Sequence, residues 1–236
     1  METVTTFTFF KYSSLGSKLW AFAMMAFSPL VLARVKGLQF CKLMGSGKEN
    51  FNPLPDWSVY AILQVWESEV AAETFFETHP LFSSYQKRTS QLMTIYLRPM
   101  SSKGLWSGTN PFEESACIDP KNPYLAIITR ATIKLRFLIR FWQFVPYAQA
   151  GLKGNPGLLY TKGIGEVPIR NMATFSLWKN KDALQLFAYQ DKAHKKAITL
   201  TKKLNWYSEE LFARFQPYRV SGEWDGISEL QFLKSD

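Results

Sequence analysis

The sequence predicts an α+β protein in which two ferredoxin-like units are fused and pack sheet against sheet, as in a dimeric α+β barrel. Three observations support this fold class. Short motifs recur in the second half of the chain in the same order, each half reads as strand, helix, strand, strand, helix, strand, and a polar linker separates the halves. The βαββαβ order is that of the ferredoxin-like unit, and 236 residues leave room for two units.

The internal repeat rests on several paired segments. GLWSG at 104–108 recurs as GEWDG at 222–226, and the residues before each copy align Pro99 with Pro217. The other pairings are Phe40 with Tyr160, Lys42 with Lys162, Trp66 with Trp178, and Trp106 with Trp224. Because the matches keep one order along the chain, we interpret them as a duplicated unit.

The first unit is expected to occupy residues 1–108. Its elements are assigned by their alignment with the second unit. They are a strand at 3–12, a helix at 18–33, strands at 38–45 and 57–66, a helix from Ser68, and a strand at 93–100. The segment TNPFEESACIDPKNP at 109–123 is the predicted linker, because Pro, Asn and acidic residues cluster in it.

The second unit is expected at 124–236. Its first strand follows a proline and is rich in β-branched residues, which favour strands. The next segment has helical spacing, and Asp182 stands where a later helix can begin. The elements are a strand at 124–134, a helix at 135–150, strands at 157–165 and 171–178, a helix from Asp182, and a strand at 211–220.

Composition limits the classes of function. The formal charge of +9 favours an anionic partner such as acidic lipid or a cofactor carboxylate. Lys and Arg form no dense block, so we do not expect nucleic-acid binding. Cys41 and Cys117 lie far apart, which indicates two free thiols in a reducing cytoplasm. Aromatic residues, 16% of the chain, suit either an aromatic core or a large apolar cavity.

The apolar segment LWAFAMMAFSPLVLA at 19–33 is the candidate for membrane contact. It is shorter than the roughly 20 residues that a spanning helix needs, and Ser28-Pro29 interrupts it. We interpret it as a buried amphipathic helix, with a helix that lies on the membrane surface as the alternative. The expected location is the cytoplasm, with peripheral contact at the inner face of the membrane under that alternative.

Familiar catalytic motifs are absent from the sequence. It has no HExxH, CxxC, GxSxG or GxGxxG pattern, and LMGSGKEN at 43–50 lacks the first glycine and the Ser/Thr of a phosphate loop. The two histidines, His79 and His194, occupy non-equivalent places in the repeat. A hydrolase triad or a two-histidine iron site is therefore a poor match.

His194 is the most informative single residue. On a helix unbroken from about Asp191, it shares a face with Phe187 and Ile198, both within about 40° around the axis. The lysines that point away from this face are Lys195, Lys196, Lys202 and Lys203. A buried imidazole needs a hydrogen-bond partner or a metal. A core histidine and a haem ligand both satisfy that need, since haem iron requires one protein ligand.

His79 has a different context. It precedes Pro80, which disfavours helical backbone at that position and predicts a loop or a helix end. In the repeat register set by Trp66 and Trp178, Phe82 is the counterpart of His194. If haem is bound, the sequence therefore predicts one haem per chain, held by the second unit.

The chain resembles the spheroidene monooxygenase family over about residues 5–226. The segments that carry the resemblance are FCKLMGSGKENFNPLPDWSVYAILQVWES, NMATFSLWKNKDALQLFAY, HKKAI and, most specifically, WYSEELFARFQPYRVSGEWDG. The resemblance implies a haem-dependent enzyme of the dimeric α+β barrel fold that places a keto group on an acyclic carotenoid, by hydroxylation and then ketone formation. It also implies haem b as the cofactor, O2 and an external electron donor as partners, and His194 as the axial iron ligand.

Further residues are candidates for the haem site. Arg214 is the candidate for a propionate or distal contact, and a salt bridge on the sheet surface is the alternative. Phe187, Trp178 and Ile198 are candidate haem-wall residues, and core packing is the alternative. Because one architecture serves several chemistries, an aldoxime dehydratase-like enzyme and a non-enzymatic binder of haem or a hydrophobic ligand stay open.

Overall fold

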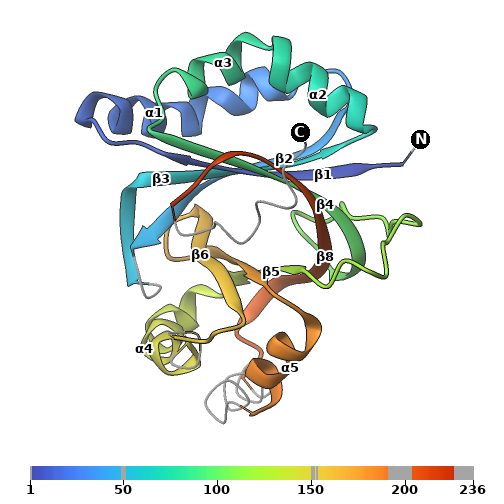
Figure 1. The fold of residues 1–236 in the computed structure, drawn as a ribbon. Helices are drawn as coiled ribbons and strands as arrows, with labels where there is room; N and C mark the ends of the chain where they lie inside the picture. The colour runs from blue at the N-terminus through green and yellow to red at the C-terminus, as the bar shows by residue number, and fades with distance from the viewer. Residues whose placement is uncertain (1, 49–51, 150–151, 153, 191–203, 226–236) are drawn as a thin grey trace.

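Eight strands close into one antiparallel barrel, in the order β1-β3-β2-β6-β7-β5-β8-β4. The structure, a computed structural model, describes residues 2–48, 52–149, 152, 154–190 and 204–225. Figure 1 shows α1, α2 and α3 on one side of the barrel and α4 and α5 on the opposite side. Each half contributes four strands, so the predicted α+β fold with two βαββαβ units is confirmed.

The first half follows the predicted order, with one helix divided. Its elements are β1 (Val4–Lys11), α1 (Leu15–Leu32), β2 (Leu38–Lys48), β3 (Asn52–Trp66), α2 (Glu69–Thr78), α3 (Pro80–Gln86) and β4 (Gln91–Gly104). The Ser68 hydroxyl caps α2 by accepting a hydrogen bond from the backbone N–H of Ala71 at 3.2 Å. His79 has extended backbone, because it precedes Pro80, and it separates α2 from α3.

The second half repeats the order with small shifts. Its elements are β5 (Leu125–Ile133), the 3-10 turn η2 (Leu135–Phe137), α4 (Leu138–Gln149), β6 (Leu158–Val167), β7 (Asn171–Trp178), α5 (Lys181–Gln190) and β8 (Tyr207–Glu223). Helix α5 begins one residue before Asp182. Asn180 caps it, since its side-chain oxygen accepts a hydrogen bond from the backbone N–H of Ala183 at 2.8 Å.

The two halves meet along two ladders of very different length. Strands β4 and β8 pair over twelve positions, whereas β2 and β6 pair at Gly45–Gly165 and Ser46–Ile164. Two ion pairs add to the short ladder: Lys42 with Glu166 at 3.0 Å, and Lys162 with Asp56 at 2.7 Å. The barrel is therefore joined firmly at one junction and narrowly at the other.

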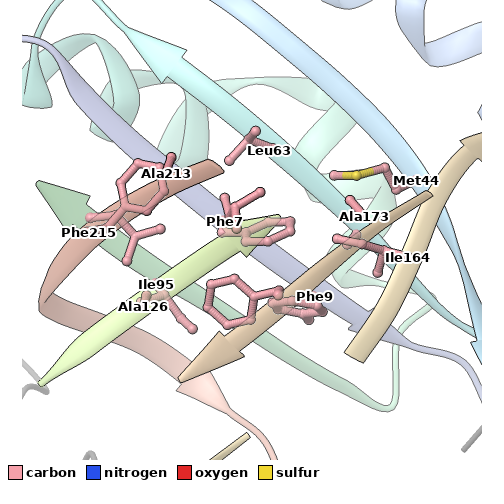
Figure 2. Close-up of a cluster of buried hydrophobic side chains, with 14 of the residues drawn as sticks. Phe7, Phe9, Met44, Leu63, Ile95, Ala126, Ile164, Ala173, Ala213 and Phe215 are labelled. Carbon is pink, nitrogen blue, oxygen red and sulfur yellow. The ribbon is translucent and has the colours of Figure 1, made fainter. Parts of the chain in front are cut away.

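The interior of the barrel is filled by side chains from both halves. Figure 2 shows Phe7 and Phe9 of β1 meeting Ala213 and Phe215 of β8 and Ile164 of β6. The ring of Phe7 lies edge-on to that of Phe175, with the ring centres 4.8 Å apart. Much of the aromatic content thus builds a core. Among the described residues, the middle of the barrel is occupied by this core.

The repeated tryptophans occupy equivalent places in the two halves. Trp106 packs against Phe40, with ring centres 5.8 Å apart, and Trp224 packs against Tyr160 at 6.1 Å. Both tryptophans belong to, or pack against, the central barrel cluster. The aligned residues of the sequence repeat therefore also contact one another in equivalent pairs.

The glycines of the repeated motif are required by the backbone. Gly104 and Gly222 have φ of 101° and 85°, a backbone region that residues other than glycine rarely adopt. An added Cβ would collide with the carbonyl oxygen of Glu210 at the first position and of Leu92 at the second. The motif therefore marks two tight crossings between β4 and β8.

Substituting either of these glycines by alanine is expected to destabilise the barrel. Strain of this kind costs about 1–3 kcal/mol, and the backbone collision adds to it, so we expect a loss of about 2 kcal/mol or more in the free energy of unfolding for Gly222→Ala. Denaturant titration measures this. The matched control is Gly45→Ala in β2, where an added Cβ meets no atom within 4 Å. Equal losses in both variants would contradict the explanation.

Helix α1 differs from its predicted role as a buried helix. Ala21, Ser28 and Leu32 are buried, but Leu15 is 74% exposed and Leu30 is 69% exposed. The interpretation as a buried helix is wrong, because the barrel covers one side of α1 and leaves the rest exposed. The sequence did not indicate this, since the helix has apolar residues on every side. Among the described residues, α1 is the one helix long and apolar enough to cross a membrane, a criterion that core helices and signal sequences also meet.

Candidate functional site

The predicted site residues fall on one face of the second half, as far as the structure describes them. Trp178 ends β7, Phe187 lies on α5, and Arg214 lies on β8. His194 and Ile198 lie outside the described residues, in the segment that follows α5. Their predicted roles stay predictions.

The strand register places the described residues on the outer face of the sheet. Ile127 of β5 is opposite Ser176 of β7 on one side and Arg214 of β8 on the other, and paired residues point to the same face. In the next row, Thr129 is opposite Thr174 and Phe212. Ala213 and Phe215, between and beside them on β8, point into the barrel. Arg214 therefore points outward, on the side where α4 and α5 lie (Figure 1).

Trp178 and Phe187 hold α5 against this face. Their rings stack with centres 5.4 Å apart and planes 29° apart. The indole N–H of Trp178 donates a hydrogen bond to the Ser176 hydroxyl at 2.9 Å. Trp178 is 1% exposed and packs with Leu125, so in the described residues it acts as core between β7 and α5. This contact determines where the chain toward His194 begins.

The outer faces of the two half-sheets are filled differently. In the first half, large aromatic side chains fill the layer between the sheet and its helices. Phe10 and Trp66 come from the sheet, and Phe82 and Tyr85 come from α3. In the second half, Thr129 is exposed and Phe212 is 39% exposed. The positions in line with Thr129 on the neighbouring strands hold small residues, Thr174 and Gly163. Among the described residues, the second half thus leaves the row of Thr129 and Phe212 weakly covered, whereas Ile127 and Ser176 in the next row are buried.

Arg214 is an exposed cation on that face. Its guanidinium lies 5.4 Å from the centre of the Phe212 ring. Within the described part of the chain, none of the ion pairs involves Arg214. The alternative role in a sheet-surface salt bridge is thus not seen there.

His79 lies in the other half and has a structural role. It ends α2 and begins α3, and its Nδ1 accepts a hydrogen bond from the backbone N–H of Leu81 at 3.2 Å. Its ring packs against Phe75 with centres 4.9 Å apart. The prediction of a helix-end histidine is confirmed. Among the described residues, no group of three or more His, Cys, Asp and Glu side chains is placed to share a metal ion.

A charged cluster at one end of the barrel was missed by sequence reasoning. Arg130 is 3% exposed and pairs with Glu209, and it lies 3.7 Å from Glu166. Glu166 accepts a hydrogen bond from the indole N–H of Trp106 at 2.6 Å and pairs with Lys42 at 3.0 Å. The cluster therefore fixes the 106–109 turn over the end of the barrel. The alignment of Lys42 with Lys162 was a usable signal, since both lysines form ion pairs.

Glu209 completes this cluster from β8. It accepts backbone hydrogen bonds from Ser107 at 3.1 Å and Gly108 at 2.7 Å. Burial alone would raise the pKa of the Glu209 carboxyl, but these N–H groups and Arg130 together hold the pKa below its ordinary value. The carboxylate is thus charged at neutral pH and ties three separate segments together.

The closed barrel, its duplicated halves and the weakly covered row define an α+β barrel protein of the fused ferredoxin-like type. No protein-family model matches the sequence. The spheroidene monooxygenase of Rhodobacter capsulatus is 33% identical over 230 residues, covering 96% of this chain and 95% of that protein. The chain belongs to the spheroidene monooxygenase family, which confirms the resemblance. The protein of that name from Cereibacter sphaeroides is also 33% identical, covering 96% of this chain and 70% of its own length.

Solved structures support the fold. An aldoxime dehydratase has a TM-score of 0.60 at 10% identity, covering 91% of this chain and 81% of its own. A second aldoxime dehydratase, in complex with butyraldoxime, has a TM-score of 0.62 at 10% identity, covering 91% and 79%. At this identity the likeness concerns the fold alone.

Proposed function

We propose that the protein is a haem-dependent monooxygenase that inserts oxygen into an apolar, carotenoid-like substrate, by hydroxylation and then ketone formation. O2 and an external electron donor are the co-reactants. The observation that carries the oxygenase activity is the 33% identity, over nearly the whole of both chains, to a spheroidene monooxygenase. The relative's name supports a carotenoid-like substrate, and an oxygenase acting on such a molecule needs an apolar surface beside its cofactor.

The second half offers residues that fit haem b. A planar macrocycle needs room over small side chains. Thr129, Thr174 and Gly163 lie side by side in one row, with Phe212 of β8 at the end of that row. The bound haem supplies the oxygen chemistry, while the protein supplies ligand, orientation and exclusion of water. In this proposal His194 holds the iron and Arg214 pairs with a propionate.

In this proposal the apolar wall of the site would come from α5 and from Ile198. Phe187 is half-buried beside Trp178, and Ile198 would continue the wall under the helical interpretation. These side chains would hold a long apolar substrate by contact area rather than by hydrogen bonds.

We infer that the protein works in the cytoplasm and meets its substrate at the inner face of the membrane. Both cysteines are free, with Cys41 partly buried and Cys117 exposed, as expected in a reducing compartment. A carotenoid-like substrate is an apolar molecule that partitions into lipid, so an enzyme that acts on it needs access to a bilayer.

The activity is testable in cells that make lycopene. Expression of the protein under air is expected to give hydroxylated and keto carotenoids, with the new oxygen atom labelled when heavy-isotope O2 is supplied. The purified protein is expected to show a haem Soret band. The label is scored in the hydroxylated product, because the oxygen of a ketone exchanges with water. Label from water instead of O2 in that product would contradict monooxygenation. Conversion of an aldoxime to a nitrile with no electron donor consumed would favour a dehydratase, and haem binding without either product would favour a carrier.

A further inference from the structure

We propose that the outer face of α1 is a docking surface for an anionic lipid bilayer. The inference concerns a partner of the protein rather than its reaction, and the contacts that carry it lie in the first half of the chain. Lipid binding and oxygenase activity can therefore fail independently of each other.

The exposed side of α1 is apolar along its whole length. We name it the α1 ridge; it consists of Leu15, Leu19, Phe22, Phe27, Leu30 and Val31, which are between 40% and 74% exposed. Between Lys18 and Arg34 the helix carries no charged residue. A soluble helix ordinarily turns a polar face to water, and contiguous exposed apolar surface of this kind marks a contact with a partner or a membrane.

The ridge is held in a fixed orientation by the opposite side of the helix. The Ser28 hydroxyl and the Tyr85 hydroxyl are hydrogen-bonded at 2.8 Å in a buried position. Trp20 packs edge-on against Tyr85, with ring centres 5.0 Å apart. Rotation of α1 to bury the ridge would break these contacts, so the apolar side is presented outward by the packing itself.

The apolar surface continues onto the sheet through Trp57. The Phe22 and Trp57 rings lie 4.9 Å apart, and Trp57 is 44% exposed. Tryptophan is enriched where proteins meet the boundary between lipid and water, because its ring is apolar and its N–H is polar. Trp57 therefore widens the ridge, and its fluorescence can report contact with lipid.

Cations flank the ridge. Lys18 stands in the first turn of α1, Arg34 and Lys36 follow its end, and Arg88 lies over the Trp20 ring at 4.6 Å. The helix itself contains no acidic residue. Apolar insertion combined with attraction to acidic headgroups is the mode by which in-plane helices bind membranes.

A second copy of the chain is a poorer occupant. In an antiparallel α1–α1 contact, the Lys18 end of one copy would meet the Arg34 end of the other. In a parallel contact, like ends would meet. Both arrangements bring cations together. The ridge also offers no polar side chain to fix a register, whereas protein interfaces carry about one hydrogen bond per 100–200 Å². A fluid bilayer needs no register.

The test is co-sedimentation of the full-length protein with vesicles of equal parts phosphatidylglycerol and phosphatidylcholine. The test variant is Leu19→Glu/Leu30→Glu, two ridge positions about 20° apart around the helix axis. The matched control is Leu135→Glu/Ile139→Glu, with Leu135 in η2 and Ile139 in the first turn of α4, where the side chains are 65% and 79% exposed. That control changes charge equally on the opposite side of the barrel (Figure 1).

We expect wild-type protein to bind these vesicles, and a part of the binding to persist at high salt, because apolar insertion is not screened. The ridge variant is expected to bind about a hundredfold more weakly, since each of the two leucines contributes about a factor of ten when it is buried in lipid. The control should stay within about twofold of wild type. Tryptophan emission should shift to shorter wavelength on binding, and the shift should be smaller in Trp57→Phe, because the chain has eight tryptophans. Both variants are checked for folding by circular dichroism.

Three results would overturn the proposal. In the first, the ridge variant binds vesicles as well as wild type does. In the second, both variants lose binding equally, which would assign the interaction to net charge or to the α4 side. In the third, wild-type protein is a stable dimer that ignores vesicles and that Leu19→Glu/Leu30→Glu converts to a monomer, which would assign the ridge to a second copy.

Discussion

His194→Ala is expected to abolish stoichiometric haem binding, with loss of the Soret band from the purified protein. Haem iron takes one ligand from the protein in the proposed site, and the chain contains one other histidine, His79. In the proposed site, removing His194 would leave the haem held by apolar contact and Arg214 alone. The measurement is the haem-to-protein ratio after reconstitution with haemin and gel filtration.

The control for this prediction is His79→Ala. His79 joins α2 to α3 and packs on Phe75, on the side of the barrel opposite α4 and α5 (Figure 1), so haem load should stay at the wild-type value. A second variant separates ligation from folding: His194→Gly should regain haem when imidazole is added. A normal haem spectrum in His194→Ala, or a loss in His79→Ala alone, would show that the assignment of His194 is wrong.

Arg130→Ala is expected to lower the free energy of unfolding by about 3–5 kcal/mol, the cost of breaking a buried ion pair by removing one partner. Arg130 is 3% exposed, and without it Glu209 and Glu166 remain together at the barrel end. Denaturant titration measures the change. The control is Lys11→Ala, which removes an exposed ion pair with Asp225 at 3.1 Å and should cost less than about 1 kcal/mol.

The pH dependence of this difference gives a second readout. The pKa of Glu209 is lowered in the folded protein, so ionised Glu209 stabilises the fold. This stabilisation is fully present at pH values above the ordinary pKa of 4.5 and is lost as the pH falls through the lowered pKa. The gap between wild type and Arg130→Ala should therefore narrow in acid. A gap below about 1 kcal/mol at neutral pH would contradict the structural role given to the pair.

The fold was predictable because the chain repeats itself. Local strand and helix patterns are weak one by one, but the alignment of Trp66 with Trp178 and Pro99 with Pro217 links them into two equivalent units. The break at His79 followed from the restriction that Pro80 imposes. The exposure of α1 did not follow, since an apolar helix without a polar side gives no sign of which side the barrel covers.

The site was predictable in part. Side-chain alternation along a strand places Arg214 on the outer face once Ala213 and Phe215 are known to point inward, and the stacking of Trp178 on Phe187 follows from the short turn between β7 and α5. The cluster around Arg130 depends on residues as far apart as Lys42 and Glu209. Sequence spacing carries no information about such contacts before the closure of the barrel is known.

The two junctions between the halves of the barrel differ in how easily they can separate. The β4–β8 ladder holds the halves together over twelve positions. The β2–β6 ladder relies on two residue pairs and on the ion pairs of Lys42 and Lys162. Partial opening of the barrel would begin between β2 and β6, since few backbone hydrogen bonds hold these two strands together. Because β8 lies between β5 and β4 in the strand order, the barrel closes only when β8 has paired with β4. The strands of the first half alone do not form a closed barrel.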